Sequence, residues 1–315
     1  MDHLPVMREN VLFYLRDFRE GTIIDGTVGL GGHTEALLEA TPAAIHVLGI
    51  DRDLEALTAS RRRLRDFGDR FTAVQASYAD IDTWKSLISR KPVIGFLMDL
   101  GLSSVQMDTP GRGFSFNDPV ALDMRFDTRG AGETAADIVN EWSEEMLADI
   151  IYRFGEDKAS RRIARAIVRR RATAPFQSAA DLAAVVAGAV PGKPQKIHPA
   201  TRTFQALRIA VNGELDHLEK GLKAGEMVLD PGGHLVIIAF HSLEDRMVKR
   251  FFIRRSGVCT CPPGLPVCVC RPRAAFRILT RHPETPKDAE VSNNPRARSA
   301  RLRCAERLPD EGGVL

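Results

Sequence analysis

The stretch Thr22-Ile-Ile-Asp-Gly-Thr-Val-Gly-Leu-Gly-Gly-His-Thr34 decides how this chain is expected to fold. A short β-branched run ends in Asp25, and a glycine-rich turn leads from it into a helical pattern. The next apolar run, Val47-Leu-Gly-Ile50, ends in a second acid, Asp51. Strand, glycine turn, helix, strand and acid is the order of a nucleotide-binding βαβ unit.

The residue types of this unit indicate its ligand. Glycines let backbone N–H groups approach a ligand closely, and the start of a helix favours an anion. An acid at the end of the second strand can accept hydrogen bonds from both ribose hydroxyls. The dinucleotide pattern G-x-G-x-x-G is not met, because Thr34 stands where the last glycine belongs. A ribose-bearing ligand with a carboxylate fits better, which points to S-adenosylmethionine. Glycine turns are common in α/β proteins, so the prediction depends on the spacing to Asp51.

Bulk composition excludes some classes of protein. The chain has 315 residues, an ordinary apolar content of 44% and a net charge of +3, which argues only weakly for a polyanionic partner. No signal-like N-terminal segment and no apolar run of about 18 residues is present. We therefore expect a soluble, cytoplasmic protein without a membrane partner.

Alternating strand and helix patterns predict a parallel sheet covered by helices on both faces. The expected strands are Thr22–Asp25, Val47–Asp51, Phe71–Gln75, Val93–Leu100 and His234–His241. The expected helices between the first four are Thr34–Glu39, Leu54–Phe67 and Ile81–Ser89.

The alternation stops after Leu100, and a long helical pattern follows a loop-like stretch. Its expected helices are Ala135–Phe154, Glu156–Arg171, Ala179–Val190 and Pro199–Lys223. We therefore expect an α/β fold. It consists of a Rossmann-like sheet that binds S-adenosylmethionine and an inserted all-helical domain. The expected domains are residues 1–104 with 216–315 for the sheet and 105–215 for the insert.

Basic residues concentrate in three places. The segment Lys158–Arg171 carries seven of them and no acid. At helical spacing five share one stripe, opposite the apolar side of Ile163, Ala166 and Ile167; they are Lys158, Arg161, Arg162, Arg165 and Arg169. Such a stripe can follow a phosphate backbone, although a solvated face that complements the helix dipole is the alternative. The second region is Arg246 to Arg255, and the third is an arginine-rich tail with basic residues at 296, 298, 301, 303 and 307. Together they favour nucleic acid without separating RNA from DNA.

The tail itself reads as a strand. From Arg301 onward the residues alternate, with Leu302 and Cys304 on one face and Arg301 and Arg303 on the other. This pattern predicts a final edge strand with an arginine-bearing face and places Cys304 in the core.

Polar residues follow the fourth and fifth strands. Asp99 ends the fourth strand on the ligand-binding edge, and Gln106 beyond it can add an amide contact; a turn-capping role for Asp99 is the alternative. His241 and Ser242 end the fifth strand, but no Gly-x-Ser-x-Gly elbow surrounds them. They can face a substrate, or Ser242 can cap a helix with Asp245 at its third position, and both can hold.

Four of the five cysteines lie close together, at Cys259, Cys261, Cys268 and Cys270. Four thiolates can bind zinc, yet the C-x-C spacing differs from the usual C-x₂₋₄-C. Free thiols in a proline-rich loop or an oxidation-prone hairpin are the alternatives, so we assign no metal ligand.

The ordered motifs resemble the ribosomal RNA small-subunit methyltransferase H family, also called MraW-type, nearly from end to end. The early motifs are His3-Leu-Pro-Val6, Asp25-Gly-Thr-Val-Gly-Leu-Gly-Gly-His33, Gly49-Ile-Asp-Arg-Asp53, Met98-Asp-Leu-Gly101 with Ser103-Ser104, Arg112-Gly-Phe-Ser-Phe116 and Leu122-Asp-Met-Arg125. The later ones are Arg162-Ile-Ala-Arg-Ala-Ile167, His198-Pro-Ala-Thr-Arg-Thr-Phe-Gln205, Phe240-His-Ser-Leu-Glu-Asp-Arg246 and Asn294-Pro-Arg-Ala-Arg-Ser299.

The resemblance implies an S-adenosylmethionine-dependent enzyme that methylates the exocyclic N4 of one cytidine in 16S rRNA, in the decoding region of the small ribosomal subunit. A homodimer is left open. The residues carried over as S-adenosylmethionine ligands are Gly31, Gly32, His33, Asp51, Tyr78, Asp99 and Gln106. Asp99, His241 and Ser242 are the candidates for a catalytic role, with Asp99 placed between donor and amine.

Two other classes of protein compete with this interpretation. An NAD(P)-dependent oxidoreductase shares the glycine turn and the second-strand acid, but the missing glycine argues against it. A non-catalytic RNA-binding protein explains the basic stripe but leaves Asp51 and Asp99 without a role. The Asp/Asn-Pro-Pro-Tyr signature of many DNA and protein amino-methyltransferases is absent, since Leu-Gly-Leu follows Asp99.

Overall fold

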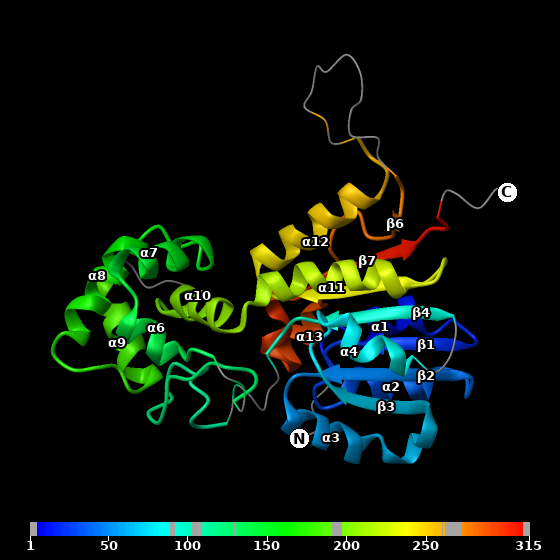
Figure 1. The fold of residues 1–315 in the computed structure, drawn as a ribbon, viewed down its shortest axis with the longest axis horizontal. Helices are drawn as coiled ribbons and strands as arrows, with labels where there is room; N and C mark the ends of the chain where they lie inside the picture. The colour runs from blue at the N-terminus through cyan, green and yellow to red at the C-terminus, as the bar shows by residue number, and fades with distance from the viewer. Residues whose placement is uncertain are drawn as a thin grey trace. The chain divides into compact units, whose positions relative to one another are not determined.

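The chain forms two compact units, an α/β unit and a helical unit (Figure 1). The computed structural model describes residues 5–88, 92–102, 107, 109–128, 130, 132–190, 197–259, 261 and 273–310. The α/β unit comprises Met1–Gly101 and His217–Leu315, and the helical unit comprises Leu102–Asp216.

The α/β unit is built on a seven-stranded sheet in the order β3-β2-β1-β4-β5-β7-β6. The strands are β1 (Gly21–Asp25), β2 (Ile45–Asp51), β3 (Phe71–Gln75), β4 (Val93–Asp99), β5 (His234–Ala239), β6 (Phe276–Ile278) and β7 (Arg301–Arg307). The first five pair in parallel, whereas β7 runs antiparallel to both β5 and β6. The strand order reverses between β1 and β4, which is where open α/β sheets bind their ligands.

Helices lie on both faces of this sheet, as the alternating pattern predicts (Figure 1). They are α1 (Arg8–Leu15), α2 (Gly32–Ala40), α3 (Leu54–Arg63), α4 (Ile81–Trp84), α11 (Glu214–Val228), α12 (Ser242–Arg255) and α13 (Asp288–Asn293). Short 3₁₀ turns occupy Arg65–Arg70, Lys85–Leu87 and Pro295–Ser299. The expected helix from Leu54 to Phe67 is therefore too long, because regular α-helix stops at Arg63.

Two apolar layers form the core of the α/β unit, because successive strand residues point to opposite faces. Ile23 of β1 packs with α1 and α2 on one face. Its neighbour Ile24 packs on the other face with α11 and α12, for instance with Leu222 and Phe252. Both strand residues are fully buried, so the sheet is covered on its two sides.

The last strand corrects one prediction. β7 is not an edge strand, because the short strand β6 pairs with its outer side. Leu302 and Cys304 are buried, as predicted, but the arginine-bearing face is largely engaged within the protein. Arg303 is buried and its Nε lies 2.6 Å from Asp245 Oδ1, while Arg301 Nη1 lies 3.2 Å from Asp245 Oδ2. Two residues of the predicted tail thus hold β7 to α12.

The helical unit contains α6 (Ala135–Glu141), α7 (Glu144–Arg153), α8 (Ser160–Arg171), α9 (Ala179–Ala189) and α10 (Thr201–Asn212). Two expected long helices are each broken. The first break lies between α6 and α7. The Ser143 side chain accepts a hydrogen bond from Met146 N there and caps the start of α7. Gly213, with φ 59°, caps α10, and α11 begins at the next residue.

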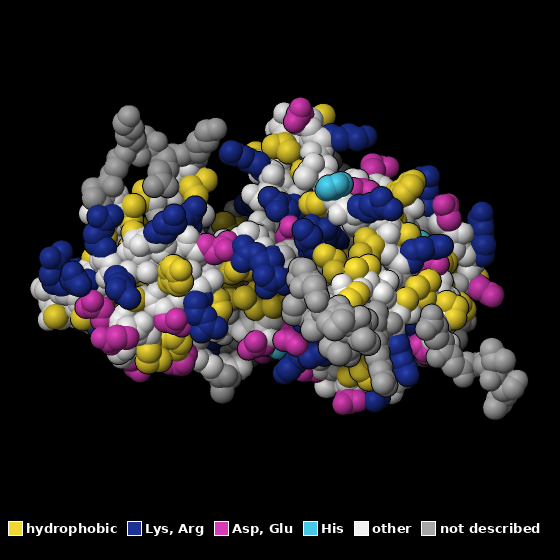
Figure 2. Space-filling model, turned by 90° about the horizontal axis from the view of Figure 1, so that it is seen from above, with side chains coloured by type: hydrophobic (Ala, Val, Ile, Leu, Met, Phe, Trp, Pro, Cys, Tyr) yellow, Lys and Arg dark blue, Asp and Glu magenta, His cyan; other side chains and the backbone are white. Residues whose placement is uncertain are grey.

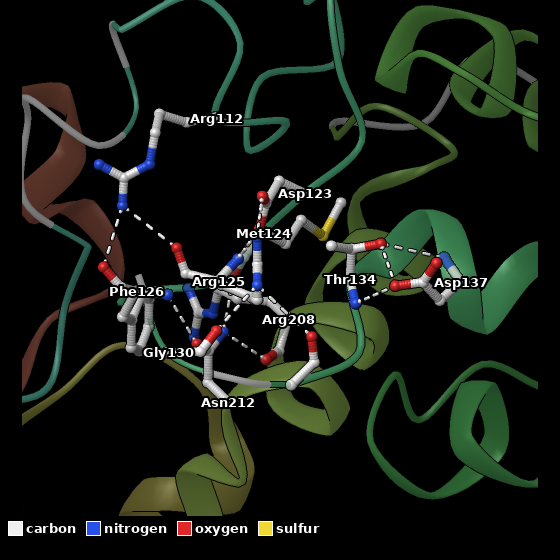
Figure 3. Close-up of polar contacts among 11 residues, drawn as sticks. Arg112, Asp123, Met124, Arg125, Phe126, Gly130, Thr134, Asp137, Arg208 and Asn212 are labelled. Carbon is white, nitrogen blue, oxygen red and sulfur yellow. Dashed lines mark hydrogen bonds and ion pairs between the residues drawn. The ribbon is translucent and has the colours of Figure 1, made fainter. Parts of the chain in front are cut away.

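The loop before α6 is held by polar contacts within the helical unit (Figure 3). Arg112 donates to the backbone oxygens of Arg125 and Phe126, each at 3.1 Å. The Asn212 side chain accepts from Phe126 N and donates to Met124 O, both at 2.8 Å. The motifs that begin at Arg112 and Leu122 therefore have a structural use here: they fasten this loop to α10.

Among the described residues, no helix combines the length and the apolar character that a membrane span needs.

The buried Asp245–Arg303 pair generates a stability prediction. Burial alone would raise the pKa of the Asp245 carboxyl, but the hydrogen bonds and charges of Arg303 and Arg301 bring that pKa below its ordinary value. Because the folded pKa is lowered, the stabilisation is complete above pH ~4 and is lost as pH falls through the lowered pKa. Asp245→Asn should lower the free energy of unfolding at pH 7 by about 3 kcal/mol, since Arg303 stays buried.

Urea unfolding at pH 7 and at pH 3 checks this prediction, and the difference between variant and parent should shrink at pH 3. The control is Asp310→Asn, which removes the partner of Arg307 at an exposed site and should cost about 0.5 kcal/mol or less. Equal losses in the two variants would show that burial of the Asp245 pair does not matter.

Candidate functional site

The turn after β1 is shaped by glycines and fastened by Asp25. Gly29 and Gly31 have φ of 51° and 84°, in the left-handed region that glycine adopts most readily. The buried Asp25 carboxylate accepts a hydrogen bond from Thr34 Oγ1 at 2.7 Å and another from Thr27 N at 3.2 Å. Burial raises the pKa of Asp25, while these two hydrogen bonds favour its charged form. The start of α2 is thereby tied to the end of β1.

Asp51 joins this turn to the end of β2. Its Oδ2 accepts from Gly29 N and its Oδ1 from Asp53 N, both at 2.9 Å. Burial raises the pKa of Asp51 to about 6, and the two backbone hydrogen bonds oppose that shift. Each carboxylate oxygen has more than one acceptor site, so Asp51 keeps the capacity to accept from hydroxyls of a ligand.

His33 and Asp99 meet at the point where the strand order reverses. His33 lies in the first turn of α2, Asp99 ends β4, and His33 Nε2 lies 3.4 Å from Asp99 Oδ2. Among the described residues, neither ring nitrogen of His33 and no group near Asp99 Oδ1 completes a hydrogen bond. Buried polar atoms of this kind are expected to find a partner, so they fit a polar ligand bound at this place.

Tyr78 lies beyond β3 at the same edge of the sheet. β3 pairs with β2 so that Gln75 is opposite Asp51, and Ala76 N donates to Asp51 O at 3.0 Å. Tyr78 follows within three residues and is half-buried. The predicted ligands therefore come from one edge of the sheet and from the start of α2. They are Gly31, Gly32, His33, Asp51, Tyr78 and Asp99.

The fifth strand ends in a helix cap that differs from the prediction. His241, and not Ser242, is the N-cap of α12, and Glu244 takes the position expected for Asp245. Glu244 Oε2 accepts from Phe240 N at 2.8 Å and from His241 N at 3.2 Å. The Asp245 carboxylate instead forms an ion pair with Arg303 of β7. The His241 side chain accepts from Glu244 N, so this ring has a structural use, and a contact of His241 or Ser242 with substrate stays a prediction.

Several predicted residues lie outside the described part of the chain. They are Gln106, Cys268 and Cys270. Cys259 is exposed and Cys261 is half-buried. The zinc interpretation therefore stays open.

The basic stripe of α8 is exposed, as predicted. Lys158, just before the helix, and Arg161, Arg162, Arg165 and Arg169 all face solvent, whereas Ile163 and Ile167 are buried. On the face drawn in Figure 2, Lys and Arg side chains form several separate groups, with Asp and Glu side chains among them. In contrast, Arg307 of the tail donates to the backbone oxygens of Glu226 and Leu308. The basic surface therefore excludes Arg303 and Arg307.

Two residues near the site were not predicted from the sequence. Gly26 donates from its N–H to Leu97 O at 2.9 Å and joins the turn to β4. His217 of α11 hydrogen-bonds Ser77 beside Tyr78, with Nδ1 2.9 Å from Oγ. Gly26 lies within the glycine-rich stretch, so the sequence pattern could have identified it. His217 is 140 residues from Ser77, and no local pattern links the two.

The sheet order, the inserted helical unit and the acids at the strand ends define an α/β protein of the Rossmann-like methyltransferase class. A family model described as the MraW methylase family matches residues 1–308. This chain belongs to that family.

Curated relatives named ribosomal RNA small subunit methyltransferase H match over nearly their whole length. Those of Pelobacter propionicus and Syntrophotalea carbinolica are each 48% identical to this chain and cover 97% of it and 98% of themselves. The relative of Geobacter sulfurreducens is also 48% identical, over 97% of this chain and 99% of its own.

The raised pKa of Asp51, together with the ribose contact that we propose below for this residue, predicts a pH-dependent affinity for S-adenosylmethionine. A carboxylate accepts from ribose hydroxyls better than a carboxyl group does, and Asp51 becomes protonated as pH falls through about 6. The dissociation constant should therefore rise about tenfold between pH 7 and pH 5. Isothermal titration calorimetry across this range measures it.

Asp51→Asn is the matched control, because an amide has nearly the same shape and does not titrate. Its affinity should be lower and should not change with pH. A pH dependence that persists in Asp51→Asn would assign the titration to another group.

Proposed function

We propose that this chain transfers a methyl group from S-adenosylmethionine to the exocyclic N4 of one cytidine in 16S rRNA of the small ribosomal subunit. Membership of the MraW methylase family and the name of its relatives, ribosomal RNA small subunit methyltransferase H, support methyl transfer to the RNA of the small subunit. The structural observation that carries the proposal is the grouping of Asp51, His33 and Asp99 beside the glycine turn. The site of this reaction is expected in the cytoplasm, where ribosomal subunits lie, and a homodimer stays a prediction.

The residues at this edge fit S-adenosylmethionine. Its ribose has two hydroxyls for Asp51, and its amino group has donors for Asp99 Oδ1, an acceptor for which the described residues offer no donor. The backbone N–H groups at the start of α2, next to Gly31 and Gly32, suit its carboxylate. We assign the Tyr78 ring a contact with adenine, because an aromatic ring can lie against a base. These roles are proposals. Gln106, which lies outside the described residues, stays a predicted ligand.

The chain's own groups must align the amine and accept its developing charge. S-adenosylmethionine supplies an electrophilic methyl group on a sulfonium sulfur. The N4 lone pair is delocalised into the cytosine ring, so orientation supplies much of the help. As the new C–N bond forms and the C–S bond breaks, N4 gains positive charge and must lose one proton. Asp99 is the proposed acceptor of the amine's hydrogen bond, since its carboxylate favours that charge.

The cytidine must leave any helical stack to reach this edge, and the RNA around it needs a separate hold. Two exposed basic surfaces suit phosphate: the α8 stripe, and the α12 face with Arg246, Lys249, Arg250 and Arg254. We propose that residues 105–215 act as the substrate-recognition domain and residues 1–104 with 216–315 as the methyltransferase domain.

The direct test uses radiolabelled S-adenosylmethionine and small ribosomal subunits from a strain that lacks the corresponding gene, followed by nucleoside analysis. We expect label in N4-methylated cytidine. Label in another nucleoside, or none with subunits and with naked 16S rRNA, would overturn the assigned substrate.

The two surfaces should separate by mutation. Charge reversal in Arg161→Glu/Arg165→Glu should raise KM for the RNA substrate at least tenfold. The salt dependence of RNA binding should become weaker, by the amount expected for the loss of about two phosphate contacts. The dissociation constant for S-adenosylmethionine should stay unchanged. Asp51→Ala should do the opposite, because it removes the proposed ribose contact together with the two hydrogen bonds that hold the glycine turn, and none of these lies on the basic stripe.

The matched control is Arg16→Glu/Arg19→Glu, the same charge change at two exposed arginines of the α/β unit. It measures the effect of net charge alone. If this control weakens RNA binding as much as the α8 variant does, the stripe on α8 is only a solvated face.

A further inference from the structure

We infer that α11 positions Tyr78 for the methyl donor, through His217 and Gly221. This inference rests on the proposed function, because it presumes that Tyr78 contacts S-adenosylmethionine. The two residues are four apart on one helix and so lie on the same face, one turn from each other. Both contact the short turn Ser77–Ala79 that follows β3.

The Tyr78 side chain passes over two glycines. A Cβ added to Gly26 would lie 3.0 Å from the Cβ of Tyr78. A Cβ added to Gly221 would lie 2.5 Å from Cδ2 and 2.6 Å from Cε2 of the Tyr78 ring. The separation at Gly26 is tight, and the two separations at Gly221 are far below normal van der Waals contact, so a side chain at Gly221 must displace the ring. The absence of side chains at both positions is what allows the ring its place.

The backbone beside Tyr78 is fixed by hydrogen bonds. Ser77 Oγ lies 2.9 Å from His217 Nδ1 and also accepts from Ala79 N at 3.2 Å. Ser77 O accepts from the indole Nε1 of the buried Trp84 at 3.2 Å. Ser77 is itself buried, so loss of the His217 partner would leave a polar group poorly satisfied. His217 thereby holds the turn from which the Tyr78 ring extends.

These contacts give α11 a task beyond covering the sheet. Its apolar residues Leu218 and Leu222 pack into the core, as in any amphipathic helix. His217 and Gly221 instead contact the turn that presents Tyr78. They are positioning residues, since they act on the methyl donor only through Tyr78.

Gly221→Ala tests the inference, with Gly225→Ala as its matched control. Gly225 lies one turn further on α11, and a Cβ there would lie 2.9 Å from Leu235 Cδ1, in the core. Both variants replace a helix glycine, so the gain in helix propensity of about 1 kcal/mol is common to the two. Gly221→Ala should raise the dissociation constant for S-adenosylmethionine about tenfold, as expected for a lost stacking contact. Gly225→Ala should change it less than about twofold.

His217 is tested by replacement and rescue. His217→Ala should raise KM for S-adenosylmethionine and leave KM for RNA unchanged, whereas His217→Asn should restore much of the loss because its amide can reach the Nδ1 position. Thermal melting of each variant separates these effects from unfolding. Equal affinities in Gly221→Ala, Gly225→Ala and the parent would overturn the positioning role, as would failure of His217→Asn to improve on His217→Ala.

Asp51→Ala, measured beside these variants, separates the two possible failures. If it weakens S-adenosylmethionine binding while Gly221→Ala does not, the binding site stands and the role of α11 is wrong. If neither variant changes the affinity, the proposed location of the methyl donor is wrong as well.

Discussion

The two hydrogen bonds accepted by Asp51 are the constraint on which the site depends. One oxygen takes the N–H of Gly29 and the other takes the N–H of Asp53, so a single carboxylate joins the turn after β1 to the end of β2. Gly29 and Gly31 can adopt many backbone conformations, and these hydrogen bonds select the left-handed one for the folded turn. Asp25 performs the same task on the other side of the turn, through Thr34. Asp51 thus has a structural use and a proposed functional use at once, whereas the use of Asp25 is structural.

The same edge explains why the unsatisfied polar atoms lie where they do. β1 and β4 are neighbours although β2 and β3 come between them in the chain, and this crossover brings His33 next to Asp99. Their unsatisfied nitrogens and oxygen would be costly in a core built only for stability. A site that exchanges its ligand at every turnover must leave such groups without a permanent partner. The buried Asp245–Arg303 pair shows the opposite case, in which both charges are satisfied inside the protein.

The sequence predicted the parallel part of the sheet well, because β1, β2 and β4 are apolar runs that each end in an acid. It predicted the exposed stripe of α8 for a similar reason, since helical spacing alone separates its two faces. Interruptions of helices were less visible: the breaks at Ser143 and Gly213 depend on local capping that periodicity does not register. The N-cap at His241 was misplaced by one residue, because serine is the commoner cap.

Long-range pairing was beyond reach for a different reason. Nothing in the alternation of Arg301 to Cys304 shows that β6, only three residues long, covers the outer side of β7. Arg303 finds Asp245 from 58 residues away, and His217 finds Ser77 from 140. Charge counted along the chain therefore overestimated the arginines available to RNA. No pattern along the chain links α11 to the turn that carries Tyr78.

The most direct test of the account is a crystal structure with S-adenosylhomocysteine, the demethylated form of the methyl donor. In that structure we expect both ribose hydroxyls on the Asp51 carboxylate, the amino group near Asp99 and adenine against Tyr78. A ligand bound elsewhere, with Asp51 contacting only the Gly29 and Asp53 amides, would contradict it.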